Sequence, residues 1–364
     1  MTLAPLENKA AAGDVHAQIA LAERLDAEGR HEDALNWLAK AAQTGDAEAL
    51  TRVGVRLIAG HNAPTMPTQG ADLLQDAALA GGGEAAAVLS VLAAVGAYRP
   101  QSWPEALDLL QRSAELGWAP AQAQLCILAG EAGGSAGPDW TGVRRAIDLD
   151  AWMRPATPTR TLCEAPRLQV FERFVPPEVC AWVIAQARDR LVRAEIYGGD
   201  QSRFVQDQSR TNTTANFTLV ETNLINLLIQ AKIGASVGAS LARMEAFNVL
   251  HYDVGEAFTD HVDFLDPAVS AYAAEIAQMG QRAASFLLYL NDDYEGGETA
   301  FPKLGLSHRG KTGDGFLFAN VHEDTGQPDV RSTHAGRTPT AGQKWVLTQF
   351  IRSRPGAGPG SSVA

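Results

Sequence analysis

The sequence predicts a multidomain α+β protein, in which an N-terminal α-helical repeat solenoid precedes a double-stranded β-helix, or jelly roll. Two observations support this fold class. Up to about residue 150 the chain reads as one short helix after another, whereas after residue 167 short apolar strands alternate with glycine-rich turns. We expect helical repeats over residues 1–134, a linker over 135–166, the jelly roll over 167–354 and a flexible tail over 355–364.

A short glycine motif recurs in the N-terminal part of the chain. Its glycines are separated by 32, 38 and 34 residues, and each is followed four residues later by an alanine: Gly13, Gly45, Gly83 and Gly117. Such a period is typical of a solenoid of helix pairs. Glycine suits the left-handed end of a helix, and alanine lets neighbouring helices pack closely.

The second unit of this array carries a more specific pattern, Glu32-Asp33-Ala34, Trp37-Leu38 and Lys40-Ala41-Ala42 before Gly45. In this the stretch resembles Sel1-like repeats, a relative of the tetratricopeptide repeat. The resemblance implies a concave surface that recruits a protein partner. A helical cap that only stabilises the neighbouring domain is the alternative.

The C-terminal half predicts a different architecture. Residues 176–191 form a helix with proline near its start. Residues 285–290 are apolar on both faces, as expected for a strand buried between two layers. Further strands are predicted at residues 169–171, 246–252, 315–318 and 344–351. Many short strands after one helix favour a double-sheet jelly roll.

Composition excludes several classes of partner. The formal net charge of −12 argues against nucleic-acid binding, which needs clustered lysine and arginine. The N-terminus shows no basic start before an apolar core, and the apolar run at 85–98 is too short to span a bilayer. The cysteines Cys126, Cys163 and Cys180 fit neither a zinc pattern nor a disulfide framework. We therefore expect a cytoplasmic protein without membrane contact and with buried cysteines.

His261 and Asp263 are the first candidate metal ligands. Residues two apart on an extended segment point the same way, so both side chains reach one face. Alone, a pair of this type is more often a hydrogen-bonded surface couple. His334 follows 73 residues later. Two histidines and one carboxylate on one face of an ion leave three positions open, as in Fe(II) oxygenases.

Lys344 lies ten residues after His334, at the start of an apolar strand. A buried ammonium is costly without a partner, so this lysine is a candidate for holding a carboxylate inside the barrel. The alternative is a lysine that keeps an edge strand soluble.

Residues from about 167 to 352 resemble the prolyl 4-hydroxylase branch of the 2-oxoglutarate oxygenases. The motifs occur in family order: Leu250-His251-Tyr252-Asp253-Val254-Gly255, His261-Val262-Asp263-Phe264, Gly280-Gln281-Arg282, Leu288-Tyr289-Leu290-Asn291-Asp292, Glu295-Gly296-Gly297-Glu298-Thr299-Ala300-Phe301-Pro302, Lys311-Thr312-Gly313-Asp314, Ser332-Thr333-His334-Ala335-Gly336 and Gly342-Gln343-Lys344-Trp345.

The resemblance implies that His261, Asp263 and His334 bind Fe(II). It implies that Lys344 and Tyr252 hold the distal carboxylate of 2-oxoglutarate, with Ser285 standing where the family has threonine. O₂ is then the co-substrate, and ascorbate stays open as a supporting reductant.

The substrate side resembles the family less closely. Arg282 stands where the family has an arginine that faces the peptide, and Arg210 lies in the segment Ser209-Arg210-Thr211, which resembles the flexible loop that closes over it. Phe258 and Phe350 replace a tyrosine and a tryptophan. The implied reaction hydroxylates an unactivated C–H bond, of a prolyl residue in a protein or peptide, and releases succinate and CO₂. Two alternatives remain, a hydroxylase of a free amino acid or other small molecule, and a catalytically degenerate interaction scaffold.

Two further features have simpler interpretations. The segment from Glu295 to Thr299 could be an acidic metal loop, but its two glycines favour a tight turn between strands. His251 and His322 have no metal spacing to a third ligand, and we interpret both as structural or exposed.

Overall fold

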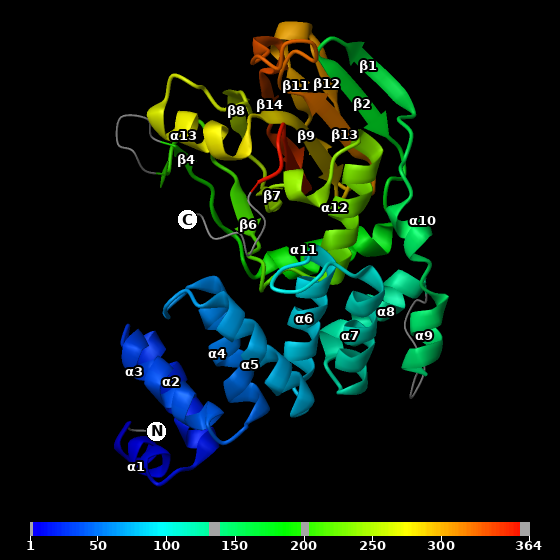
Figure 1. Cartoon of the computed structure of the whole chain (residues 1–364). Helices are drawn as coiled ribbons and strands as arrows, with labels where there is room; N and C mark the ends of the chain where they lie inside the picture. The colour runs from blue at the N-terminus through cyan, green and yellow to red at the C-terminus, as the bar shows by residue number, and fades with distance from the viewer. Residues whose placement is uncertain (1–2, 131–138, 198–203, 357–364) are drawn as a thin grey trace. The chain divides into compact units, whose positions relative to one another are not determined.

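The computed structural model describes residues 3–130, 139–197 and 204–356 (Figure 1). These residues form two compact units. One comprises residues 3–149 together with 218–227, and the other comprises the rest of the described chain. The helical array and the jelly roll expected from the sequence are both present, one in each unit.

The first unit is an array of antiparallel helix pairs. Its helices are α1 (Leu3–Ala11), α2 (Val15–Ala27), α3 (His31–Ala42), α4 (Ala47–Ala59), α5 (Pro67–Leu79), α6 (Gly83–Val95), α7 (Trp103–Glu115), α8 (Ala119–Ala129) and α9 (Trp140–Ala146).

The recurring glycine motif lies at the turn from one helix pair to the next. Gly13 and Gly45 take positive φ angles of 94° and 81°, and the aspartate after each caps the following helix. In the third unit the positive φ belongs to Gly81 (99°), while Gly83 is the first residue of α6. The structural period is therefore 32, 36 and 36 residues (13 to 45, 45 to 81, 81 to 117), more regular than the one read from Gly83.

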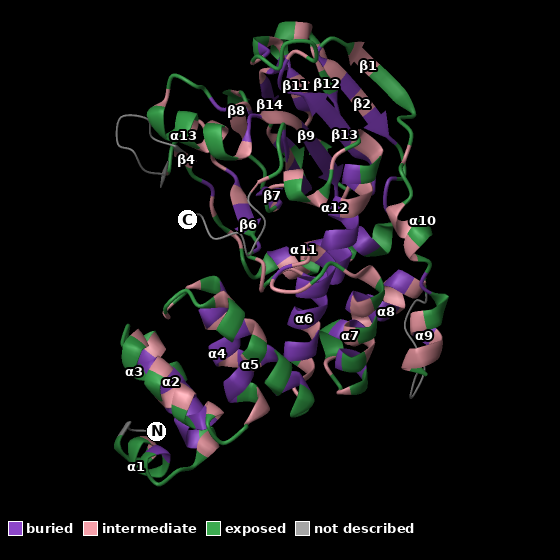
Figure 2. Cartoon of the chain, in the orientation of Figure 1, coloured by how far each residue is buried: buried purple, intermediate pink, exposed green. Residues whose placement is uncertain are grey.

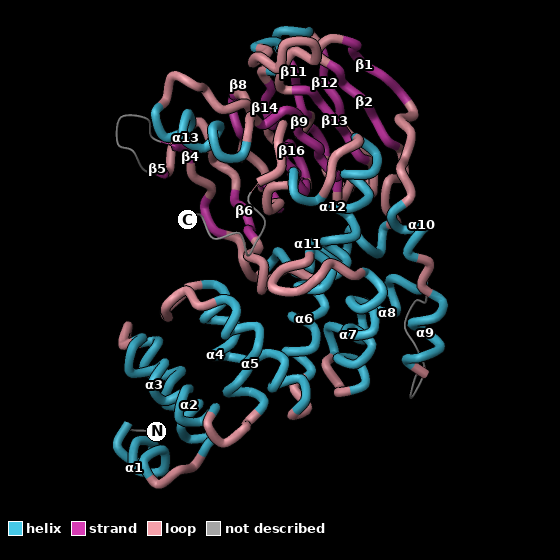
Figure 3. Tube along the Cα trace, viewed as in Figure 1, coloured by secondary structure: helices cyan, strands magenta, loops and turns pink. Residues whose placement is uncertain are grey.

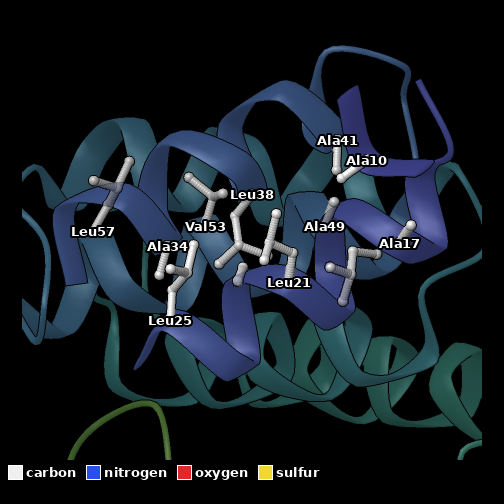
Figure 4. Packing of buried hydrophobic residues seen from close by; sticks show 12 residues of the cluster. Ala10, Ala17, Leu21, Leu25, Ala34, Leu38, Ala41, Ala49, Val53 and Leu57 are labelled. Carbon is white, nitrogen blue, oxygen red and sulfur yellow. The ribbon is translucent and has the colours of Figure 1, made fainter. Parts of the chain in front are cut away.

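Alanine and leucine fill the space between these helices. In Figure 4 the side chains of Leu21, Leu25 and Leu38 point toward one another from α2 and α3, and Val53 and Leu57 of α4 join them. A second cluster centres on α5 and α6 and includes Leu219 and Val220 from the segment 218–227. Burial of these apolar faces is the main stabilising term of such arrays.

The segment expected to be a linker, 135–166, contains regular structure. Within it lie α9, α10 (Leu149–Met153) and β1 (Arg160–Glu164). The α9 helix packs on α7 and α8, and Arg144 forms an ion pair with Asp108 at 2.9 Å. The glycine- and proline-rich composition of this segment therefore did not reveal its short helices and strand. Of the expected tail, residues 357–364 lie outside the described chain.

The second unit contains the helices α11 (Pro177–Arg188), α12 (Leu224–Val237, from residue 228 onward) and α13 (Ser270–Met279). Its strands after β1 are β2 (Arg167–Phe171), β3 (Val192–Arg193), β4 (Ile196–Tyr197), β5 (Phe204–Val205), β6 (Thr213–Asn216), β7 (Asn248–Tyr252), β8 (Phe258–His261), β9 (Arg282–Tyr289), β10 (Glu295–Gly296), β11 (Thr299–Phe301), β12 (Leu306–His308), β13 (Gly315–Ala319), β14 (His334–Gly336), β15 (Pro339–Ala341) and β16 (Lys344–Arg352).

Two antiparallel sheets build the jelly roll (Figures 1 and 3). The major sheet has the order β1-β2-β13-β9-β16-β7-β6-β3, and the minor sheet has the order β12-β11-β14-β8. Between them lies a core rich in phenylalanine, which includes Phe301, Phe316 and Phe318. The central strands β9 and β13 are buried along most of their length, as Figure 2 shows.

The cysteines agree only in part with the expectation that all three are free and buried. The three cysteines are free, but only Cys180 is buried, because Cys163 lies on the edge strand β1 and Cys126 is half-buried on α8. Among the described residues, none of the helices has the length and apolar character needed to cross a membrane.

The close crossing of α4 and α5 gives a first prediction. A Cβ on Gly70 would lie 2.6 Å from the Gly54 carbonyl oxygen and 2.8 Å from Ile58 Cγ1. Replacing a helical glycine by alanine gains up to about 1 kcal/mol of helix propensity, whereas overpacking costs about 1–3 kcal/mol. Because a backbone atom is contacted, we expect Gly70→Ala to lower the free energy of unfolding in urea titrations followed by circular dichroism.

The matched control is Gln69→Ala, on the exposed side of the same turn, which should stay within about 0.5 kcal/mol of the parent. A Gly70→Ala protein as stable as the Gln69→Ala control would contradict the close crossing.

Candidate active site

A cavity of about 570 Å³ lies between the two sheets of the second unit. Strand alternation decides which side chains reach it, because every second residue of a strand faces the same way. Asn248, Leu250 and Tyr252 of β7 line it, as do the alternate residues Lys344, Val346, Thr348 and Phe350 of β16. The other wall belongs to the minor sheet.

The three predicted metal ligands converge on the minor-sheet side of this cavity. His334 on β14 is the direct cross-strand partner of His261 on β8, and Asp263 follows β8 by two residues. Asp263 Oδ1 lies 3.7 Å from His261 Nε2, and Asp263 Oδ2 lies 3.5 Å from His334 Nε2. One ligand atom from each residue lies within 4.8 Å of the other two.

Both imidazoles present Nε2 to this point. His261 Nδ1 lies 2.8 Å from the carbonyl oxygen of Thr259, and His334 Nδ1 lies 3.0 Å from that of Ser332. Donation from Nδ1–H to these carbonyls leaves Nε2 as a free acceptor, the tautomer that a metal requires. Burial, with the nearby His334, lowers the pKa of His261 to about 3, so this imidazole is neutral at pH 7.

Asp263 is ionised although it is buried. Burial alone would raise the pKa of its carboxyl, but His334, His261 and a hydrogen bond from Ser285 outweigh that effect and lower the pKa. Ser285 Oγ donates to Asp263 Oδ2 at 2.6 Å, and Asn320 Nδ2 donates to Ser285 Oγ at 2.9 Å. The chain Asn320–Ser285–Asp263 therefore fixes the carboxylate in its orientation.

This placement departs from the expectation that Ser285 binds 2-oxoglutarate. Ser285 shares the inward face of β9 with Leu287, but Asp263 takes its hydroxyl, and Ser285 is not among the residues that line the cavity. No local sequence pattern indicated Asn320, which lies 35 residues away from Ser285.

Aromatic rings hold the two histidines in place. Phe258 stacks on His261 with ring centroids 3.5 Å apart and planes 12° from parallel. Phe301 and Phe318 pack on His334 at 5.6 and 4.6 Å. These contacts cover a face of each imidazole and restrict rotation of the rings.

Lys344 and Tyr252 lie side by side on the major sheet. They are register partners on β16 and β7, and Lys344 Nζ lies 5.1 Å from the centroid of the Tyr252 ring. Within the described chain, Lys344 is only 2% exposed and its ammonium has neither an ion pair nor a hydrogen bond. Burial lowers its pKa to about 8 and raises that of Tyr252 to about 12, so both groups are hydrogen-bond donors at pH 7.

A buried cation without a partner is unfavourable unless a ligand supplies the negative charge. Lys344 therefore fits the distal carboxylate of a dicarboxylic acid. Gly336 makes room for this arrangement, because a Cβ there would lie 2.9 Å from the Tyr252 hydroxyl oxygen.

The four residues expected on the substrate side form two arginine–phenylalanine pairs at the cavity wall. The Arg210 guanidinium lies 4.6 Å from the centroid of the Phe258 ring, and that of Arg282 lies 3.9 Å from the centroid of Phe350. Arg282 is neutralised by a two-pronged ion pair with Glu245 at 2.8 and 2.9 Å, which the sequence did not predict.

The acidic segment from Glu295 to Thr299 and the two histidines His251 and His322 remain to be placed. Gly296 and Gly297 both take a φ of 66° between β10 and β11, so the acidic segment is a turn. His322 is partly exposed and lies 3.6 Å from Asp329. His251 is buried on the outer face of β7.

The donor set fits Fe(II) and 2-oxoglutarate. Two imidazoles and one carboxylate on one face of an ion define the site of a non-haem Fe(II) oxygenase, and a jelly roll carries it here. His261, Asp263 and His334 would hold the iron, and Lys344 with Tyr252 would hold the distal carboxylate of 2-oxoglutarate.

Known proteins agree with this class. The family model of the 2OG-Fe(II) oxygenase superfamily matches residues 247–352. Prolyl 4-hydroxylase 1 of Arabidopsis thaliana is 31% identical over 204 residues, which cover 52% of this chain and 70% of that protein. The chain belongs to the 2OG-Fe(II) oxygenase superfamily and is a prolyl 4-hydroxylase-like dioxygenase.

Two solved structures are similar to separate parts of the chain. A viral collagen prolyl hydroxylase from Paramecium Bursaria Chlorella virus-1, solved as a 2OG complex, is 22% identical with a TM-score of 0.40 and covers 52% of this chain and 98% of its own. A Sel1 repeat protein from Oxalobacter formigenes is 27% identical with a TM-score of 0.31 and covers 34% of this chain and 97% of its own.

The position of Ser285 gives a prediction that separates its two roles. Ser285→Ala leaves Asp263 and Asn320 without their shared partner, so metal affinity should fall by about 10- to 100-fold. At saturating metal, the Kd for 2-oxoglutarate should change little. Ser285→Thr keeps the hydroxyl and serves as the control. Unchanged metal affinity with a raised Kd for 2-oxoglutarate would return Ser285 to the carboxylate site.

Lys344 gives a prediction on pH. Its pKa is lowered to about 8, so the ammonium is charged below that pH and neutral above it. 2-oxoglutarate binding, measured anaerobically by calorimetry on the Fe(II)-loaded enzyme, should weaken by up to about tenfold for each pH unit above about 8. In Lys344→Arg the cation does not titrate in this range, so any remaining affinity should be independent of pH. A flat profile for the parent enzyme would contradict the assignment.

Proposed function

We propose that this enzyme hydroxylates a prolyl residue in a protein or peptide, while 2-oxoglutarate is converted to succinate and CO₂. The observation that carries the proposal is that one cavity joins the His261–Asp263–His334 triad to the buried Lys344, which forms no ion pair within the described chain. One oxygen atom of O₂ would enter the C–H bond and the other would enter succinate, so atoms and electrons balance.

The chain's own residues position the reactants. Lys344 and Tyr252 bind the distal carboxylate and so place the 2-oxo end toward the triad. Bound Fe(II) supplies the activation of O₂. The aromatic rings beside His261 and His334 cover a face of each imidazole, which limits the access of water to the ligands and with it unproductive reactions.

The cavity wall supports an apolar ring as the target. Phe258 lies beside the first iron ligand and Phe350 lies on the opposite sheet, so a pyrrolidine ring could rest between apolar surfaces near the metal. Relatives of the chain are named prolyl 4-hydroxylases. The helical repeats would recruit the protein that carries the proline, since such arrays present extended binding surfaces.

The test is a mass-shift screen. The enzyme with Fe(II), 2-oxoglutarate and ascorbate is incubated with host lysate and with the host amino-acid pool, and gain of one oxygen on proline is sought by mass spectrometry. The proposal expects hydroxyproline in a defined set of proteins, absent when His334→Ala replaces the enzyme. Hydroxylation of a free amino acid with no protein-bound product would contradict it.

One observation favours a second candidate, a substrate with a free carboxylate such as an amino acid. Arg210 lines the cavity, and in the described chain it has no carboxylate partner; its contacts are the Glu195 carbonyl at 3.0 Å and the Asn212 amide oxygen at 3.4 Å. Burial lowers its pKa, so an anion beside it would be stabilising.

Comparison of L-proline with L-prolinamide tests this candidate. If Arg210 binds a substrate carboxylate, only L-proline should stimulate 2-oxoglutarate turnover, and Arg210→Gln should raise its KM while Arg210→Lys restores part of the affinity. Equal stimulation by both compounds, or by neither, would exclude this role of Arg210.

A further inference from the structure

A second group of possible metal ligands lies on the outer face of β7. Tyr252 points into the cavity, so its neighbour His251 points to the opposite side of the major sheet, where its ring packs on Trp345 with centroids 4.3 Å apart. Asp253 follows two residues after His251, the same spacing as His261 and Asp263. Glu256 belongs to the turn that leads into β8.

The His251 ring is prepared in the way that the iron ligands are. It is 5% exposed, and Nδ1 lies 3.0 Å from Thr213 Oγ1, whose hydroxyl is 3.5 Å from the His251 carbonyl oxygen. If Thr213 donates to that carbonyl, Nδ1–H donates to Thr213 and Nε2 is left as a bare acceptor. Within the described chain, Nε2 is buried and has no hydrogen-bond partner.

Two carboxylates lie beside this nitrogen. Asp253 Oδ1 is 3.9 Å from His251 Nε2, too far for a hydrogen bond. One oxygen of Glu256 completes a group whose three ligand atoms lie within 4.8 Å of one another. Nitrogen and oxygen ligands bind zinc at about 2.0–2.2 Å, so two tetrahedral ligands of one ion stand about 3.4 Å apart. Asp253 Oδ1 would therefore approach His251 Nε2 by a few tenths of an ångström when an ion binds.

The carboxylates are also oriented. Gln343 Nε2 donates to Asp253 Oδ1 at 2.7 Å, and Glu256 Oε2 accepts the backbone N–H of Asp253 at 2.9 Å. Each carboxylate keeps lone pairs for an ion. Two acidic residues on an exposed turn would by themselves be a solvated surface. Here a buried imidazole nitrogen without a hydrogen-bond partner lies close to them, which is unfavourable, and a bound cation would supply the missing partner.

We propose that His251, Asp253 and Glu256 form a second site for a divalent transition-metal ion, of which Zn²⁺ is the representative. It is separate from the iron centre, because it lies on the opposite face of β7 and shares no ligand with it. An ion there would fix the turn between Tyr252 and Phe258, which joins the 2-oxoglutarate site to the strand that carries His261.

The test counts bound zinc by equilibrium dialysis of the full-length chain and elemental analysis. The parent should bind two equivalents, and His334→Ala, which weakens the iron site, should keep one. Asp253→Asn combined with Glu256→Gln should also keep one, and the three substitutions together should bind none. A second equivalent that persists in the Asp253→Asn/Glu256→Gln protein, or is missing from the parent, would overturn the proposal.

Two measurements keep the result specific. Asp324→Asn removes another exposed turn aspartate close in sequence to a histidine, His322, and should leave both equivalents in place. In the His334→Ala background, Ni²⁺ should quench tryptophan fluorescence because Trp345 packs on His251. Adding Asp253→Asn should lower the Ni²⁺ affinity measured in this way at least tenfold. Quenching that is equal in both proteins would contradict the site. Because Asp253 is exposed, its substitution does not disturb the core.

Discussion

The whole active site depends on one buried negative charge, the carboxylate of Asp263. Water cannot stabilise this group, so the protein must supply its partners. It does so with two imidazoles on adjacent strands of the minor sheet and with the hydroxyl of Ser285 on the major sheet. The carboxylate is thereby bound from both layers of the jelly roll, and the distance between the two sheets fixes where a metal ion can lie.

A complementary positive charge lies on the other wall. Among the residues that the structure describes, Lys344 forms no ion pair, whereas Arg282 and Arg352 share Glu245. Arg282 and Arg352 therefore stabilise the fold, whereas the charge of Lys344 is available to a ligand. Bound Fe(II) would place a positive charge beside Asp263, and a dianionic 2-oxo acid would place a negative charge beside Lys344, so each buried charge would gain a partner of opposite sign on its own wall. A buried cation without an ion-pair partner lowers the stability of the folded protein, and it selects for a ligand that carries a carboxylate.

Much of this architecture was predictable from the sequence. The resemblance to the prolyl 4-hydroxylase branch assigned Tyr252 and Lys344 to the 2-oxoglutarate site, and the spacing of His261 and Asp263 together with His334 indicated the triad. Contacts between distant residues were not predictable, because no local pattern records them: Asn320 to Ser285, or Glu245 to Arg282 across 37 residues. Gly83 was aligned with the other repeat glycines for a similar reason, since only the backbone shows that Gly81 has the left-handed conformation.

The inner faces of the two sheets would hold Fe(II) and 2-oxoglutarate through these particular side chains. The most direct measurement is a crystal structure of the full-length chain with Mn²⁺ in place of iron and with 2-oxoglutarate. We expect anomalous density between His261 Nε2, Asp263 and His334 Nε2, with the distal carboxylate on Lys344 and Tyr252. Metal density away from the triad, or a carboxylate bound by Arg282 with Lys344 left unpaired, would contradict it.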